Sequence, residues 1–444
     1  MAVYNLVTQH NTTQHNTPYC VTSANQPPSF RKRLKDRLKQ CKLITVPYYS
    51  LIRPLKNAVY KFSMKHEPFR SAAVKICGYK ICRLSTVYDY CKEHNGIIRV
   101  YDDSCEYPAR PLCKTREDFE ANNISEPVMR PAYYIYVSKL QNAVIFGKED
   151  LIFAGNCCLA DRKKQIQGVH HYISRNIPEI RPNTALVKVP KSPAVIERGI
   201  DLTKMWSENI YHFSYEALSR LQLVDAVEEY RTWPLIIDDG ITTDAWRKEL
   251  LRRVNVYNHP VILISLNEPY RVKELIYPSF LNWDGERHLG YAPRMHTMAA
   301  DYIRERVLAN HKPSRTYKNV YIVRGNRLHN EQEVIEVFSR YGIDIVHPKT
   351  FSENVDAFMS ADNIIGAVGS NMAGVPFSKP GANIYVITPF EFQADNNCFE
   401  ITDVSRRKLH FIPADVLKIN VLLNHTSFTV DISKIEALAQ KLSR

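Results

Sequence analysis

Residues that can act on a hydroxyl group and on an anion lie in two separate segments of this chain. The first segment, 208–221, reads ENIYHFSYEALSRL and is predicted to be helical. His212 and Glu216 are four positions apart, so their side chains share one face of that helix. A carboxylate beside an imidazole can accept a proton from a hydroxyl group if partial burial raises its pKa. The alternative is an ordinary polar pair on a solvated face.

The second segment carries two arginines at the end of a predicted strand, 319–323. Arg324 and Arg327 follow that strand. In open parallel sheets, ligands bind beyond the carboxyl ends of the strands. The guanidinium fork can bind phosphate oxygens with two hydrogen bonds. This position favours an anion site, and the alternative is a pair of solvated arginines that only end the strand.

A loop of small residues follows a later strand, 363–367. The loop begins at Gly366 and contains Gly369, Ser370 and Asn371. Small residues let backbone N–H groups approach a phosphate, especially where a helix begins at Ser370 or Asn371. The loop lacks the dinucleotide-binding glycine pattern and the Walker lysine, so neither NAD nor ATP is indicated. A tight strand-to-helix turn without a ligand is the alternative.

Several common catalytic and metal-binding patterns are absent from the sequence. It contains no Asp-x-Asp, no Gly-x-Ser-x-Gly and no His-Glu-x-x-His, and the nearest acidic cluster is Asp284-Gly285-Glu286 in a predicted loop. None of the ten cysteines forms a zinc-type pair. We therefore expect no metal and no other cofactor.

Length and composition indicate a soluble globular protein of two domains. The chain has 444 residues, of which 45% are hydrophobic and 24% are charged. It has no unbroken apolar run of about 18 residues, and its N-terminus lacks the pattern of a signal peptide. We therefore expect reduced thiols and a cytoplasmic location.

The net charge of +13 is concentrated near the N-terminus. Residues 31–65 contain eleven Lys or Arg and one acid, Asp36. Leu34, Leu38 and Cys41 repeat at helical spacing among these cations, as in an amphipathic helix. Such a helix can lie on an anionic membrane surface, where each cation contributes about 1 kcal/mol. A solvated basic face is the alternative; nucleic acid is less favoured because no nucleic-acid-binding module follows.

The pattern of apolar residues changes along the chain. Short apolar runs at 133–137, 143–146 and 151–154 predict strands, whereas helices and strands alternate from residue 205 onward, which predicts a parallel sheet. The predicted parts are a disordered polar tail at 1–30, a basic amphipathic segment at 31–66, an N-terminal domain at 67–295, a C-terminal domain at 296–425 and a closing helix within 426–444.

Read in order, these segments resemble glycosyltransferase family 61, over about residues 133–390 and most firmly over 205–390. The motifs that carry the resemblance are Asn209-Ile210-Tyr211-His212, then Glu216, Leu218-Ser219-Arg220-Leu221, Tyr321-Ile322-Val323-Arg324, Arg327, Asn330-Glu331-Gln332-Glu333-Val334-Ile335 and the predicted helix from Phe351 to Asp362. One position departs from the family, whose members usually have Gly-x-His-Gly where this chain has Val368 in place of the histidine. The departure concerns how the diphosphate of the donor is bound.

The resemblance implies an α/β fold with two Rossmann-like domains facing each other across a cleft, the GT-B architecture of metal-independent, inverting glycosyltransferases. Residues 67–295 would bind the acceptor and residues 296–425 the nucleotide sugar. It implies Glu216 as general base, oriented by His212, and Asn209 and Tyr211 on the acceptor side. The donor-binding residues that it implies are Arg324, Arg327, Asn330, Glu331, Gly366, Gly369, Ser370 and Asn371.

The reaction implied is transfer of a sugar, with inversion, from a nucleotide sugar to a glycan or glycolipid acceptor. Capsule or lipopolysaccharide synthesis at the inner face of the cytoplasmic membrane is the expected setting, with residues 31–65 on the membrane. The first alternative is an inactive binding or scaffold protein that has lost catalysis with the loop histidine. The second is a basic membrane-adaptor or nucleic-acid-associated protein.

Overall fold

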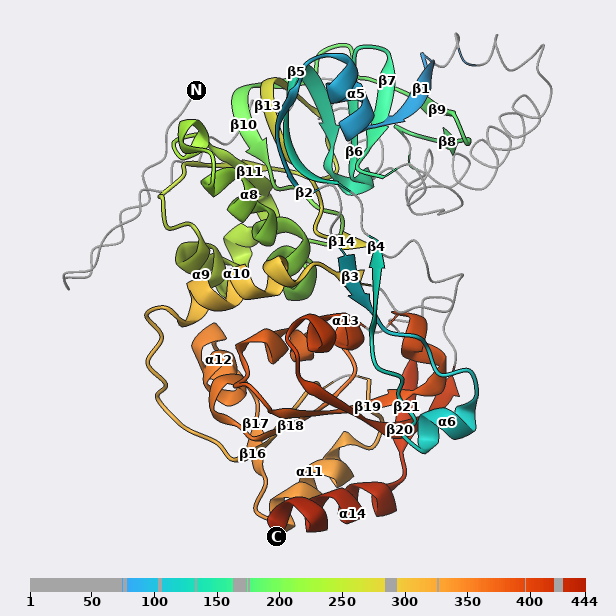
Figure 1. The fold of residues 1–444 in the computed structure, drawn as a ribbon, viewed down its shortest axis with the longest axis vertical. Helices are drawn as coiled ribbons and strands as arrows, with labels where there is room; N and C mark the ends of the chain where they lie inside the picture. The colour runs from blue at the N-terminus through green and yellow to red at the C-terminus, as the bar shows by residue number, and fades with distance from the viewer. Residues whose placement is uncertain are drawn as a thin grey trace, which may run out of the picture.

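A computed structural model gives the fold as two units stacked along the long axis of the molecule (Figure 1). It describes residues 74, 78–102, 106–131, 134–162, 174, 176–283, 294–325, 327–395, 397–418 and 426–444. The predicted tail 1–30, the basic segment 31–66 and the acidic cluster at 284–286 lie outside the described residues.

The N-terminal unit is built on one mixed sheet of eleven strands. The strands are β1 (Lys80–Thr86), β2 (Ile97–Asp102), β5 (Ile135–Phe146), β6 (Leu151–Ala154), β7 (Cys157–Ala160), β8 (Glu179–Ile180), β9 (Thr184–Val187), β10 (Ala194–Asp201), β11 (Leu235–Asp238), β12 (Val261–Ile264) and β13 (Tyr270–Pro278). Their order is β12-β11-β10-β13-β5-β6-β7-β1-β9-β8, and β2 also pairs with β5.

Only part of this sheet is parallel. Strands β12, β11, β10 and β13 run parallel to one another, whereas β5 is antiparallel to β13 and to β6. The α/β class predicted from the sequence is confirmed. Two Rossmann-like domains are not confirmed, because the N-terminal sheet continues into antiparallel strands.

Strand β5 joins two runs that the sequence predicted as separate strands, 133–137 and 143–146. The polar residues Gln141 and Asn142 interrupt the apolar pattern, and Asn142 has a positive φ of 51°. Pairing with β13 nevertheless continues on both sides of the interruption, from Gln141 opposite Glu274 to Ala143 opposite Val272. Strand pairing therefore overrode the local turn signal.

Short helices lie between the strands of the N-terminal unit, and α10 (Thr297–Leu308) leads from it into the C-terminal unit. The short helices are α5 (Val87–Glu93), η2 (Gly147–Glu149), η4 (His212–Ala217), η5 (Leu218–Arg220), α8 (Leu221–Asp225), η6 (Glu228–Tyr230), η7 (Asp239–Thr243) and α9 (Ala245–Val254). The helix predicted at 208–221 is present but irregular, because η4 is a π-helix and η5 a 3₁₀ turn. Short π-helical segments, which are wider than an α-helix, are frequent at functional sites.

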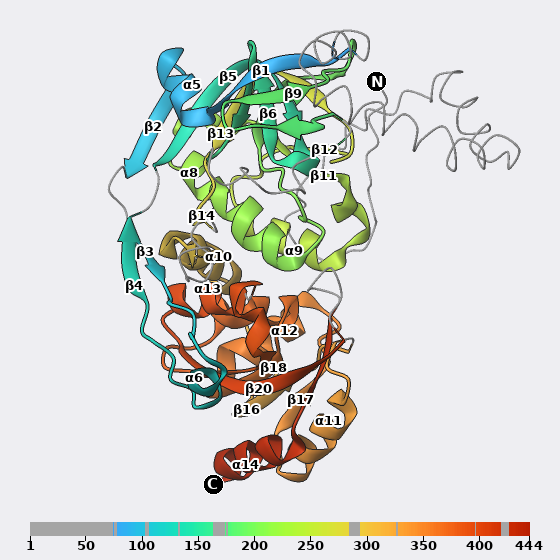
Figure 2. The same ribbon diagram turned by 90° about the vertical axis from the view of Figure 1, so that its right-hand side faces the viewer.

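The C-terminal unit has three layers and confirms the predicted alternation. Its sheet has the order β17-β16-β18-β19-β20-β21, which is parallel except for β21, and its first five strands have a doubly wound order. Helices α12 and α13 lie on the face toward the N-terminal unit, and α11 and α14 lie on the opposite face (Figures 1 and 2). The elements are β16 (Asn319–Ile322), α11 (Glu331–Arg340), β17 (Asp344–Val346), α12 (Phe351–Ser360), β18 (Asn363–Ala367), η9 (Ser370–Phe377), β19 (Asn383–Pro389), η10 (Phe390–Asp395), α13 (Asn397–Val404), β20 (Lys408–Lys418), β21 (Ser427–Val430) and α14 (Ile432–Ser443).

An arm from the N-terminal half of the sequence reaches along the C-terminal unit (Figure 2). It consists of β3 (Glu106–Ala109), α6 (Arg116–Glu120) and β4 (Val128–Pro131). Arg110 of the arm forms a buried ion pair with Asp403, in which Nε lies 2.9 Å from Oδ1. The ring of Phe119 stacks on Phe411 with centroids 4.5 Å apart. The arm therefore ties the two units together on one side.

Candidate active site

His212 and Glu216 meet on the π-helix η4, as their spacing predicted. His212 Nδ1 lies 2.9 Å from Glu216 Oε2. The side chain of Glu216 is 8% exposed and that of His212 is 18% exposed. The carboxylate is therefore the inner member of the pair, and the imidazole is the member nearer to solvent.

Three side chains besides His212 form the surroundings of Glu216: two contact it directly, and the third holds one of these two. Lys204 Nζ lies 3.4 Å from Glu216 Oε2, and Asn282 donates a hydrogen bond of 2.9 Å to Oε1. Lys204 is itself held by Asp150, with Nζ 2.5 Å from Oδ2. None of these three residues was predicted, because each comes from a different segment of the chain and lacks a motif of its own.

The expectation that burial would raise the pKa of Glu216 is wrong in its outcome. Burial does favour the neutral acid, but the charges of His212 and Lys204 outweigh it and lower the pKa of Glu216 to about 2. A carboxylate with so low a pKa is a weak proton acceptor at neutral pH. It is instead a permanent negative charge beside the imidazole.

Arg220 fixes the end of the same motif. Its guanidinium is fully buried and donates hydrogen bonds to the carbonyl oxygen of Pro278, at 2.9 and 2.6 Å, and to that of Thr203, at 3.2 Å. The ring of Phe280 lies 4.5 Å from the guanidinium carbon. These contacts join the segments that follow β10 and β13 to the motif helix, so Arg220 is structural.

In the C-terminal unit, Arg324 and the small-residue loop come together beyond the carboxyl ends of β16 and β18. Arg324 Nη1 donates a 3.1 Å hydrogen bond to Asn371 Oδ1. Gly369 has a φ of +148°, and a Cβ built on it would lie 1.1 Å from Nη1 of Arg324. Only glycine therefore allows the guanidinium to lie against this loop. The first N–H groups of η9, at Ser370 and Asn371, lie beside it.

Arg327 adds a second positive charge to the same region. It donates a 3.2 Å hydrogen bond to the carbonyl oxygen of Thr426 and lies over the ring of Phe392, 4.9 Å from its centroid. Burial, and then repulsion from Arg324, lower the pKa of Arg327 to about 10, so it remains charged at neutral pH. Two guanidinium groups that repel each other are stabilised by a bound anion.

Four predicted binding residues have side chains that bond within the protein. Glu331 accepts hydrogen bonds from the backbone N–H groups of Arg324 and Gly325, at 2.8 and 2.6 Å, and so shapes the turn that follows β16. Asn330 bonds to the backbone of Val430 in both directions. The same holds for the acceptor-side residues: Asn209 Oδ1 accepts from the backbone N–H of Tyr211, and the buried hydroxyl of Tyr211 donates to Glu400.

Gly366 and Val368, which belong to the loop predicted from the sequence, both face the interior of the C-terminal unit. Gly366 lies in β18, where a Cβ would meet Sδ of Met372 at 2.4 Å, so this glycine lets η9 fold back on the strand. Val368 is buried in the apolar core, and its N–H donates to the carbonyl oxygen of Ile387 at 2.9 Å. Val368 therefore presents no side-chain donor to a ligand.

The two halves of the site lie at one interface. The hydroxyl of Tyr215, one turn after His212, donates a 2.6 Å hydrogen bond to the carbonyl oxygen of Ala373, one turn after Ser370. Helix α10 packs against both η4 and η9. The pair His212 and Glu216 (the acid–base pair) is distant in sequence from the region of Arg324 and Gly369 (the arginine loop). The two are thus joined through helices that contact each other directly.

Other features of the described residues do not compete with this site. A cavity of about 540 Å³ is lined by residues of β1, α5 and the segment before β9, such as Arg83 and Asp89, none of which belongs to a motif. Within the described part, no three His, Cys, Asp or Glu side chains are grouped as a metal site would require. Among the described helices, none has both the length and the apolar character needed to cross a membrane.

Comparison with known proteins agrees with the motifs. Residues 210–385 match the model of the family described as Glycosyltransferase 61. The match begins just before His212 and ends in β19, so it includes both the acid–base pair and the loop at Gly369. No curated protein matches the sequence. The segment that carries the candidate active site, less than half of the chain, is therefore similar to the glycosyltransferase 61 family.

Proposed function

We propose that this protein transfers a sugar, with inversion, from a nucleotide sugar bound by the C-terminal unit to a hydroxyl group held at the N-terminal unit. The observation that carries the proposal is the joining of the His212 pair to the arginine loop through Tyr215 and Ala373. Proton acceptor and anion site then lie on opposite sides of one interface. The two units would act as a GT-B-type pair.

In this proposal His212 is the general base and Glu216 holds it in place. Nδ1 lies 2.9 Å from Glu216 Oε2, so the carboxylate favours a proton on Nδ1 by its charge and leaves the lone pair of Nε2 for the acceptor hydroxyl. Lys204, which lowers the pKa of Glu216 alongside His212, keeps an opposite charge beside the carboxylate when the imidazole is neutral, and this supports the assignment over the reverse one. The negative carboxylate also stabilises the imidazolium that forms when the proton arrives.

The bond changes follow from these positions. The acceptor oxygen loses its proton to Nε2 of His212 and forms a bond to the anomeric carbon of the donor. The bond from that carbon to the diphosphate oxygen breaks on the opposite face, which inverts the configuration. Arg324, Arg327 and the first N–H groups of η9 offset the charge that develops on the leaving diphosphate.

Binding of the donor is the first test. Nucleoside diphosphates and their sugars, screened by thermal shift with and without EDTA, should include at least one ligand that stabilises the protein in both conditions. A ligand at about 100 times its Kd adds about 2.7 kcal/mol to the free energy of unfolding. Independence from EDTA is expected because the sequence has no Asp-x-Asp clamp.

Arg324→Ala should lose this shift, whereas Arg315→Ala should keep it. Arg315 is a matched control, since it lies in the same unit and pairs with Asp344 on the surface. No shift with any nucleotide, or equal shifts in both variants, would contradict the proposed donor site.

A second candidate is a binding or scaffold protein without transferase activity. It is supported by Val368, which is buried where the family usually has a histidine and so contributes no hydrogen bond to a diphosphate. Nucleotide binding that depends on Arg324, together with no sugar transfer and no donor hydrolysis, would favour this candidate.

The proposed setting is synthesis of a surface polysaccharide, such as capsule or lipopolysaccharide, on the cytoplasmic side of the membrane. The basic segment 31–65 supports attachment to anionic lipid. Full-length protein should therefore bind vesicles that contain an anionic phospholipid, and deletion of residues 1–45 should weaken this binding. Equal binding by both proteins would contradict attachment through this segment.

A further inference from the structure

Trp206 is an exposed aromatic residue in a strained backbone conformation beside His212. Its side chain is 43% exposed, and its φ is +64°, in the left-handed region that bulky residues rarely adopt. Such conformations persist only where the surrounding structure enforces them, and they cluster at functional sites. An exposed ring has no packing reason to be held in this way.

Buried anchors on both sides impose this conformation. Before Trp206, the backbone N–H of Met205 donates to Asp150 Oδ1 at 2.5 Å. After it, Ser207 Oγ donates to Asp238 Oδ2 at 2.6 Å, and the buried Arg247 donates to the carbonyl oxygen of Ser207 at 2.9 Å.

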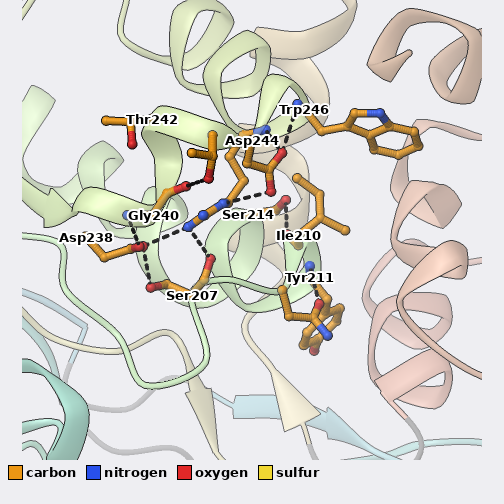
Figure 3. Close-up of polar contacts among 12 residues, drawn as sticks. Ser207, Ile210, Tyr211, Ser214, Asp238, Gly240, Thr242, Asp244 and Trp246 are labelled. Atoms are coloured by element: carbon orange, nitrogen blue, oxygen red, sulfur yellow. Dashed lines mark hydrogen bonds and ion pairs between the residues drawn. The ribbon is translucent and has the colours of Figure 1, made fainter. Parts of the chain in front are cut away.

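Figure 3 shows Ser207 and Asp238 of this network, with the start of the motif helix at Ile210 and Tyr211 beside them. Arg247 also bonds to Asp238 Oδ2, at 2.8 Å. The anchors are charged groups inside the protein, so the loop is held rigidly while the indole remains exposed.

The ring is directed toward the proposed chemistry. Its centroid lies 5.6 Å from that of the His212 imidazole. Lys204, which also contacts Glu216, has Nζ 5.9 Å from the indole centroid. The same short segment therefore supplies a cation for Glu216 and an aromatic face beside the proposed base.

We propose that Trp206 is the floor of an acceptor-sugar subsite, on which the ring of the acceptor stacks while its hydroxyl reaches Nε2 of His212. This inference rests on the proposed transferase function. A flat indole matches the apolar C–H face of a pyranose, whose hydroxyl groups project around its edge. A rigid aromatic platform also orients the acceptor at little conformational cost.

Saturation-transfer NMR and titration with a panel of methyl glycosides of common hexoses and pentoses test the subsite directly. These probes need no knowledge of the natural acceptor, and the experiment uses the full chain with the nucleotide that it binds. At least one glycoside should bind the wild-type protein, with saturation strongest on the C–H face of the sugar. Trp206→Ala should weaken that binding about tenfold, as expected for loss of one aromatic stacking contact.

Tyr257→Ala is the matched control. Tyr257 is 40% exposed and has Arg231 over its ring, so it resembles Trp206 in exposure and in its neighbouring cation but lies after α9. This variant should bind the glycosides as the wild type does. Equal glycoside binding by wild type and Trp206→Ala, or no glycoside binding by the wild type, would overturn the subsite. A nucleotide shift lost in Trp206→Ala would also overturn it, by assigning the ring to the donor.

Trp206→Gly separates a binding role from a structural one. Glycine accepts a positive φ without strain, so the melting temperature of Trp206→Gly should exceed that of Trp206→Ala. Glycoside binding should stay weak in both variants. Recovery of binding in proportion to stability would show that the ring acts only through the fold. The proposed transferase fails separately, by the absence of any nucleotide shift in the wild-type protein.

Discussion

Around Glu216, one carboxylate is balanced by His212 and Lys204. Around Gly369, by contrast, Arg324 and Arg327 lie close together, and burial and then repulsion from Arg324 lower the pKa of Arg327. The first region is a buried arrangement in which each charge faces an opposite one. The second concentrates charge of one sign beside glycine and helix N–H groups.

In the proposed reaction, this difference separates two tasks. A proton acceptor must keep a fixed orientation, and an opposite charge behind the imidazole provides it. A site for a leaving diphosphate must instead place positive charge and N–H donors where the negative charge develops. In the proposed function, orientation thus belongs to the N-terminal unit and anion binding to the C-terminal unit.

The largest effect is expected from His212→Gln, which removes the proposed base but keeps a polar side chain. Sugar transfer should fall by about 10²–10⁴-fold, the usual contribution of a general base, while nucleotide binding persists. Steady-state transfer rates and thermal shift measure the two effects. His94→Gln, at the exposed end of α5, is the control and should leave both unchanged. Transfer by His212→Gln at the wild-type rate would remove His212 from the mechanism.

A somewhat smaller effect is expected where Arg324 lies against Gly369. Gly369→Ala should displace the guanidinium of Arg324, because the new Cβ would occupy the position of Nη1. Transfer should fall by about 10²–10³-fold, the same loss that we expect from Arg324→Ala. Kinetics of both single variants and of the double variant test the contact.

The double variant should be no worse than either single variant, because both changes remove the same interaction. Additive losses would instead mean that Gly369 acts through backbone strain or its own N–H groups, independently of Arg324.

The pH dependence of transfer distinguishes the two members of the acid–base pair. The folded-state pKa of Glu216, about 2, is below its ordinary value of 4.5, so its stabilising charge is present above pH 4.5 and is lost as pH falls toward 2. Because Glu216 is ionised above pH 4.5, its own titration should produce no acid limb of kcat/KM above that pH. A midpoint between pH 2 and 4.5 would return the base role to Glu216.

The smallest effect is expected from Tyr215→Phe, which removes the hydrogen bond between the two regions. Loss of one buried hydrogen bond should reduce the free energy of unfolding by about 1–2 kcal/mol in urea titrations. Nucleotide binding should survive, because the hydroxyl of Tyr215 bonds to Ala373, within η9, and not to Arg324 or Gly369. A larger loss of transfer than of stability would show that this bond also aligns the two units.

Some features of the site follow from local pattern and were predicted. The alternation of strands and helices from residue 319 onward predicted the parallel sheet and therefore the place of Arg324 and Gly369 at its edge. The spacing of His212 and Glu216 predicted their contact, which exists although the helix is a π-helix. Both predictions depend on residues that are near in sequence or on the general topology of parallel sheets.

Other features depended on distant residues and were not predicted. Lys204 and Asn282 reach Glu216 from separate segments, and Asp150 holds Lys204 in place, so only the folded chain shows that Glu216 has Lys204 and a hydrogen-bond donor beside it. The antiparallel continuation of the N-terminal sheet arose because pairing of β5 with β13 overrode the turn signal at Asn142.

By itself, the sequence determined the α/β class, the family motifs and the candidate residues for the site, because these follow from residue type and short-range spacing. The tertiary structure alone decided which member of the pair is buried, how its pKa shifts and where Trp206 lies relative to His212. The physical reason is that burial and electrostatic surroundings depend on side chains brought together from distant positions. Residue types along one segment do not specify them.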